Sequence, residues 1–87
     1  MSITVEFFGI ARQRAGVAAL QVEAASLRQA LRELDAKCPA LHGVCWDSNG
    51  LLPGYIANRG GERFVSDLDT PLAPGESLLI LSTDAGG

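Results

Sequence analysis

Alternation of apolar and polar residues opens the chain. Apolar side chains stand at every second position from 3 to 7, with polar ones between them: Ile3, Val5 and Phe7 against Thr4 and Glu6. This period of two is typical of a β-strand with one buried face. A shorter alternation at positions 20–23 predicts a second strand, and the two can pair as a hairpin across one connection.

The middle of the chain changes to a helical period. Ser26 and Gln29 form a capping box, in which the Ser26 hydroxyl accepts the Gln29 backbone N–H and the Gln29 side chain reaches back. The apolar residues that follow repeat every three or four positions and make one stripe: Leu27, Ala30, Leu31, Leu34 and Cys38. Pro39 ends this helix, because proline disfavours helical geometry in the residue before it.

Residues 39–54 contain several glycines and prolines and are predicted to form a long irregular connection. Trp46 lies within it, either as a partner contact or as a cap on the core, and we favour the core. Two strands are predicted at 55–58 and 64–65, around a turn that needs the positive φ of Gly60 or Gly61.

A final strand is predicted at 77–82, and it carries leucine or isoleucine on both faces. A strand that is apolar on both sides is central in a sheet, and each side needs a cover other than polar solvent. The helix can cover one face. The other face is either an exposed docking patch or is closed by the 39–54 connection.

One helix among several strands predicts an α+β fold with the helix across one face of a mixed sheet. The 87 residues are enough for one domain, 1–87, with a flexible C-terminal tail at 83–87. A net charge of −3 gives no electrostatic footprint for nucleic acid or an anionic membrane. The N-terminus has no basic segment followed by an apolar run, so we expect a cytoplasmic protein.

Cys38, His42 and Cys45 have the spacing of an imaginable metal site. Zinc sites have tighter paired spacings and four ligands, so we expect no metal here and two free thiols instead.

The sequence ends on Gly86 and Gly87, directly after the final strand. Glycine lets another protein's backbone approach closely, so a tail of this kind can enter a narrow channel. Fully extended, residues 83–87 span roughly 16 Å at about 3.3 Å per residue. A terminal carboxylate on such a tail can reach a partner's active site, whereas the simpler interpretation is a frayed chain end.

Three segments together resemble the ubiquitin-like sulfur-carrier family. They are the opening run from Ile3 to Gly9 with Arg12 and Gly16 after it, the block from Asp69 to Ile80, and the terminal glycine pair. The similarity covers nearly the whole chain and is closest to the small subunit of molybdopterin synthase. It implies a ubiquitin-like β-grasp fold, in which the first and last strands are parallel neighbours at the centre of the sheet.

The resemblance also implies the chemistry and the site. A ubiquitin-activating-like adenylyltransferase would use ATP and magnesium to adenylate the Gly87 carboxylate, which then becomes a thiocarboxylate. The chain would bind no cofactor and would be a carrier subunit, with catalysis supplied by that enzyme and by the molybdopterin synthase large subunit or another acceptor. The implied site residues are the reactive pair, Gly86 and Gly87, and the partner-facing residues Phe8, Arg12, Phe64, Leu81, Asp84 and Ala85.

Residues 82–85 lack the prolines typical of the molybdopterin-type tail and add a charge at Asp84. Carriers for thiamin, cysteine or transfer-RNA thiolation therefore stay open. A ubiquitin-like protein modifier is a second class, and Lys37, the only lysine, limits its self-chains to one internal site. A plain interaction module is a third.

Phe8 is a candidate contact residue on grounds independent of the family. An aromatic side chain on the polar side of a strand suggests a contact surface, unless a loop covers it.

Overall fold

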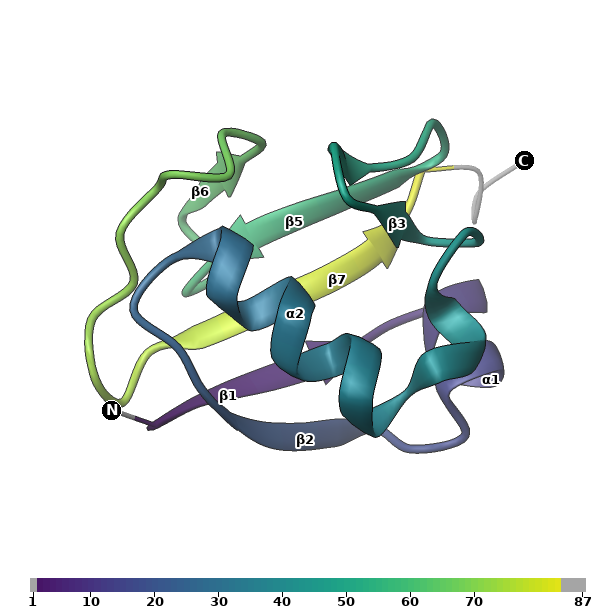
Figure 1. Cartoon of the computed structure of the whole chain (residues 1–87), viewed down its shortest axis with the longest axis horizontal. Helices are drawn as coiled ribbons and strands as arrows, with labels where there is room; N and C mark the ends of the chain where they lie inside the picture. The colour runs from purple at the N-terminus through teal and green to yellow at the C-terminus, as the bar shows by residue number, and fades with distance from the viewer. Residues whose placement is uncertain (1, 84–87) are drawn as a thin grey trace.

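The computed structural model describes residues 2–83 and contains one five-stranded mixed sheet, crossed on one face by a helix (Figure 1). The elements in chain order are β1 (Ser2–Phe7), α1 (Ile10–Ala15), β2 (Ala19–Glu23), α2 (Leu27–Lys37), the 3₁₀ turn η1 (Pro39–Leu41), β3 (Trp46–Asp47), β4 (Gly50–Leu51), β5 (Tyr55–Arg59), β6 (Arg63–Val65) and β7 (Ser77–Ser82).

The strand order in the sheet is β2-β1-β7-β5-β6. Strands β1 and β7 are parallel and central, whereas the other neighbours are antiparallel. The predicted hairpin of the first two strands, the central final strand and the parallel pairing are confirmed. The predicted α+β class is confirmed as well, and the arrangement is that of a ubiquitin-like β-grasp fold.

The capping box begins α2 as the sequence predicts. The Ser26 hydroxyl accepts the Gln29 backbone N–H at 3.2 Å, and the Gln29 side chain accepts the Ala25 backbone N–H at 2.8 Å. The four apolar residues of the stripe inside the helix are buried, and Cys38 follows as its C-cap. The stripe packs against the sheet face that carries Ile3, Val5 and Phe7.

The connection after α2 is more ordered than its composition predicts. It contains η1 and the small β3–β4 hairpin, and its side chains at 41, 45 and 46 lie in the main core. Trp46 is fully buried, which confirms it as a core residue, and its indole N–H donates to the Asp35 carboxylate at 2.7 Å. Asp35 also contacts His42 at 2.9 Å, so one carboxylate on α2 holds two points of the connection.

Both α2 and the connection therefore lie on the same side of the sheet (Figure 1). This decides between the two alternatives for the second face of the final strand, because the 39–54 connection lies with α2 and does not close that face. Leu78 and Ile80 face the core and are fully buried, whereas Leu79 and Leu81 alternate with them and remain half-buried on the opposite face. Among residues 2–83, no helix packs over that opposite face, which we call the open face.

Candidate functional site

Strands β1 and β7 end at the same edge of the sheet, because the two strands are parallel. We call the C-terminal end of β7 at this edge the exit of the chain. Directly after β7, Thr83 donates its backbone N–H to the Gly54 carbonyl at 2.8 Å. The first position of the predicted tail is thus hydrogen-bonded to the loop before β5. Four predicted site residues lie outside the described part of the chain: Asp84, Ala85, Gly86 and Gly87.

The open face carries an apolar row at the end where β7 stops. Leu81 is paired with Ile56 on β5, and Phe8 follows the last residue pair between β1 and β7. The Phe8 backbone N–H donates to the Ile80 carbonyl at 3.0 Å, which continues the strand alternation and keeps Phe8 on this face. All three side chains are half-buried. This apolar row, Phe8, Leu81 and Ile56, lies next to the exit of the chain.

One step back along the strands lies a mixed row. The strand register places Glu6 beside Leu79, Leu79 beside Asn58, and Asn58 beside Phe64. Phe64 is 66% exposed, so it belongs to the surface and not to the core. The next row, with Thr4 paired to Ser77, is polar. The open face is therefore apolar near the exit of the chain and increasingly polar away from it.

Arg12 projects from α1 to the apolar row. Its Nε donates to the Phe7 carbonyl at 2.9 Å, and its guanidinium carbon lies 5.3 Å from the centre of the Phe8 ring. A guanidinium over an aromatic face at this distance is a favourable cation–π contact. Arg12 is exposed but fixed, and it places a positive charge beside the apolar row.

Phe8, Leu81 and Phe64 thus come from three separated parts of the sequence and share the open face, with Arg12 at its rim. This arrangement is what a docking surface requires: large apolar groups without a cover and a charged group at the edge. Their role in partner binding stays a prediction.

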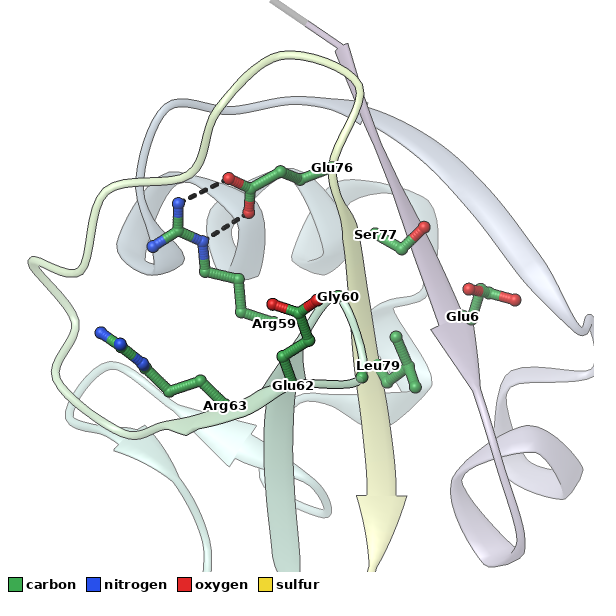
Figure 2. Close-up of a pocket in the computed structure, with 9 residues that line it drawn as sticks. Glu6, Arg59, Gly60, Glu62, Arg63, Glu76, Ser77 and Leu79 are labelled. Carbon is green, nitrogen blue, oxygen red and sulfur yellow. Dashed lines mark hydrogen bonds and ion pairs between the residues drawn. The ribbon is translucent and has the colours of Figure 1, made fainter.

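A depression of about 790 Å³ begins at the mixed row and extends around the turn between β5 and β6. Figure 2 shows the residues that line it. Arg59 and Glu76 form a bidentate ion pair in its wall, with both N–O distances at 2.6 Å. Hydrogen bonds from Arg59 hold the pKa of the Glu76 carboxyl below its ordinary value. The remaining charged side chains that line the depression are Glu6, Glu62 and Arg63.

The imagined metal site does not form among the described residues. No group of three histidine, cysteine, aspartate or glutamate side chains within residues 2–83 is arranged to hold a metal ion. His42 is turned to Asp35, and Cys38 and Cys45 are free thiols. Burial raises the pKa of both thiols, which favours their protonated form. Within the same residues, no helix is long and apolar enough to cross a membrane.

Two features of this site leave little or no signal in the sequence. Helix α1 has six residues and buries only Ala11, so its sequence shows no helical repeat of apolar residues. The only local signal is Gly16 at its C-cap, which lies in the left-handed region at φ 77°. Asn58 was predicted only as a strand residue. It is 7% exposed, and its side-chain carbonyl oxygen has no hydrogen-bond partner.

Several solved structures resemble this chain. SAMP1 from Haloferax volcanii aligns over 100% of both chains, with 24% sequence identity and a TM-score of 0.85. A chain of the Amycolatopsis orientalis BexX/CysO complex aligns over 98% of this chain and 99% of its own, with 18% identity and a TM-score of 0.82. A chain of the complex of subunits 1 and 2 of the Helicobacter pylori 26695 molybdopterin-converting factor aligns over 100% of both chains, with 22% identity and a TM-score of 0.67.

No protein-family model and no curated protein sequence matches the chain. The structural likeness, together with the strand order and the single main helix, establishes the ubiquitin-like β-grasp fold.

Proposed function

We propose that this chain is a ubiquitin-like sulfur carrier that delivers sulfur as a thiocarboxylate on Gly87, for the synthesis of molybdopterin. The observation that supports this most is the position of the apolar row on the open face, directly beside the exit of β7. Four residues, the number from position 84 to Gly87, would span roughly 13 Å if they were fully extended at about 3.3 Å per residue. A partner that covers the apolar row can therefore also enclose the terminal carboxylate.

The chemistry follows from the low reactivity of a carboxylate. One Gly87 carboxylate oxygen attacks the α-phosphorus of ATP in the partner's active site, and pyrophosphate leaves. The acyl-adenylate now has AMP as a good leaving group, and a sulfur donor displaces it, so that a C–S bond replaces a C–O bond. ATP and magnesium belong to the activating partner, and the carrier itself needs no bound cofactor.

Two kinds of protein partner follow from this proposal. The first is a ubiquitin-activating-like adenylyltransferase, and the second is the molybdopterin synthase large subunit or another sulfur acceptor enzyme. Two of the structural neighbours support a protein partner in general, because one belongs to a complex of two molybdopterin-converting factor subunits and the other to the BexX/CysO complex. The carrier then works as a subunit whose catalysis is supplied by its partners, and it works in the cytoplasm with them.

A second candidate is a protein modifier, in which the activated Gly87 is joined to a lysine of a target. The neighbour SAMP1 is a small archaeal modifier protein, which favours this candidate. Both candidates share the adenylation step and differ in the group that attacks next. Carriers for thiamin, cysteine or transfer-RNA thiolation share the thiocarboxylate and differ only in the acceptor.

The test is intact-mass spectrometry of the untagged protein. The mass of the protein from its source cells first establishes whether the mature chain ends at Gly87, as the proposal requires. The protein is then incubated with ATP, magnesium, a sulfur donor and candidate adenylyltransferases. A gain that matches one oxygen replaced by sulfur, localised to Gly87, supports the carrier. Conjugates with an isopeptide bond and no thiocarboxylate favour the modifier.

Two variants separate the tail from the docking face. Deletion of Gly87 should abolish the mass gain and leave the unfolding free energy unchanged, because a tail outside the core contributes little to stability. Phe8→Asp should weaken adenylyltransferase binding while the chain stays folded. An unfolded Phe8→Asp variant would assign Phe8 to the core instead.

A further inference from the structure

Strand β2 is the outermost strand on one side of the sheet, and its outer side pairs with no other strand within residues 2–83 (Figure 1). The Phe7 backbone N–H donates to the Ala18 carbonyl at 2.9 Å, so hydrogen-bonded residue pairs alternate from there along β1 and β2. The backbone groups of Ala19 and Gln21 therefore point outward. In the described part of the chain, neither residue has a backbone hydrogen-bond partner on that side.

This outer side lacks the devices that protect exposed strands. Soluble proteins protect such strands with charged side chains, prolines, bulges or a covering segment. Positions 17–22 contain no charged residue and no proline, and the register of β1 with β2 runs over five successive pairs without a bulge. The outermost strand on the other side, β6, is only three residues long and begins with Arg63. Strand β2 is therefore the side of the sheet that is open to pairing.

The side chains around the outer side of β2 also leave it accessible. The Gln21 side chain is turned back to β1, where its carbonyl accepts the Ser2 hydroxyl at 2.6 Å and its amide donates to the Thr4 hydroxyl at 2.9 Å. It therefore does not satisfy the backbone groups of its own strand. Directly before β2, Val17 is 40% exposed, which is unusual for a large apolar side chain in this molecule. Both backbone donors and apolar area are thus available to a neighbour.

The outer side of β2 is complementary to itself. In an antiparallel pair centred on Gln21, this residue faces Gln21 of the second copy, and Ala19 faces Glu23 of the second copy. No like charges are opposed, because Glu23 is the only charged residue of the strand. On the core side, the half-buried Leu20 faces Val22 of the second copy, which places one apolar side chain against another. A second copy of this chain therefore fits the whole length of β2.

We propose that the chain forms a two-fold dimer in which the β2 strands of two copies pair antiparallel, centred on Gln21, and join the two sheets into one. The same surface serves both copies, as two-fold symmetry requires. Strand β1 lies between β2 and β7, so this pairing leaves the exit of the chain free. Because the two copies run in opposite directions, their exits lie at opposite ends of the joined sheet. The dimer does not depend on the proposed function.

The first test is a concentration series on the wild-type chain, followed by sedimentation equilibrium and by ¹⁵N NMR. A contact through one strand is small, so the dissociation constant should lie in roughly the high micromolar to millimolar range. The amide resonances of Ala19 and Gln21 should shift with concentration, and their hydrogen exchange should become slower. A chain that stays monomeric at millimolar concentration overturns the dimer. Concentration-dependent shifts confined to other strands overturn the assignment to β2.

The second test uses the fact that Gln21 faces itself across the two-fold axis. Gln21→Lys opposes two ammonium groups and Gln21→Glu opposes two carboxylates, so each variant alone should raise the dissociation constant about fivefold. When the ¹⁵N-labelled lysine variant is titrated with the unlabelled glutamate variant, opposite charges face each other. The mixed dimer should therefore regain about the wild-type affinity.

A matched control separates this effect from a change in net charge. Asn49→Lys and Asn49→Glu make the same changes in charge at an exposed position between β3 and β4, and they should leave the dimer unchanged. Circular dichroism checks that each variant is folded. A mixture of the two position-21 variants that associates no better than either alone overturns the pairing at Gln21. If either variant does not fold, the dilution shifts of the wild-type chain still decide whether β2 is the interface.

Discussion

Replacing Asn58 with leucine should stabilise the isolated chain. Asn58 is the one polar side chain classed as buried among residues 2–83, and its carbonyl oxygen has no hydrogen-bond partner. Leucine has a similar size and comes to lie beside Leu79 in the register. The substitution removes an unpaired polar group and adds an apolar contact, and both changes favour the folded state.

The expected gain follows from the cost of the unpaired group. A buried polar atom without a partner costs about 1–3 kcal/mol. The mixed row is only partly covered, so we expect the lower end of that range, about 1 kcal/mol in the free energy of unfolding. For a domain of this size, 1 kcal/mol corresponds to a rise of about 4–8 °C in the melting temperature.

Urea denaturation followed by Trp46 fluorescence measures the change, because Trp46 is the only tryptophan and is fully buried. Asn58→Asp is the matched control. It keeps the shape of the side chain, but it puts a charge into a buried position and should destabilise the chain. A leucine variant that is less stable than the wild type would refute the reasoning, since the carbonyl oxygen would then already have a favourable partner.

The same leucine variant should bind the adenylyltransferase as tightly as the wild type does, because the Asn58 carbonyl oxygen is buried and a docked partner cannot reach it. A loss of binding would mean instead that the Asn58 side chain turns outward when the partner docks. A gain in stability with unchanged binding would assign the unpaired oxygen no part in docking.

Three further outcomes follow from the structure. Trp46→Phe should cost about 1.5–3 kcal/mol of stability in urea denaturation followed by circular dichroism, because the hydrogen bond to the charged Asp35 is lost. Arg59 lowers the pKa of Glu76, so this carboxyl contributes stability that is present above its unfolded pKa near 4.5 and is lost as the pH falls through the folded value. Melting temperatures measured from pH 7 to pH 3 should therefore fall less steeply for Glu76→Gln than for the wild type. Iodoacetamide should spare Cys45 in the native chain and modify it after unfolding, because the thiol is buried and its pKa is raised.

Each of these has a contrary result. A Trp46→Phe variant as stable as the wild type would mean that the hydrogen bond from Trp46 to Asp35 contributes nothing to the free energy of unfolding. Parallel pH profiles for the wild type and Glu76→Gln would show that the ion pair with Arg59 is not formed in solution. Rapid labelling of Cys45 at neutral pH, followed by peptide mass spectrometry, would indicate that the 39–54 connection opens readily.

Much of the fold was predictable from short-range patterns. The alternation around Val5 and the capped stripe beginning at Ser26 each report one buried side, and a local pattern of this kind needs no knowledge of the rest of the chain. Helix α1 was missed because a six-residue helix with one buried side chain has no period to detect. The hairpin of β3 and β4 was missed because two-residue strands carry no alternation.

The candidate site was predictable only in part. The terminal glycines and the aromatic at Phe8 are visible in the sequence, and both motivated the expectation of a docking protein. For Phe64 and Leu81 the sequence offered only the family resemblance, since both could also be core residues of their strands. Asn58 gave no signal at all, because an asparagine in a strand of mixed residues is unremarkable until its neighbours across two strand pairs are known.

The sequence by itself determined five strands and the main helix, the central place of β7 in the sheet, and the glycine pair at 86–87. Only the tertiary structure decided which side of the sheet is covered. Strand β7 is apolar on both sides, so alternation cannot distinguish the core face of Leu78 from the open face of Leu79. That choice is made where Trp46 and Leu41 join α2 over the same face, and their burial there leaves the opposite row of side chains free for a partner.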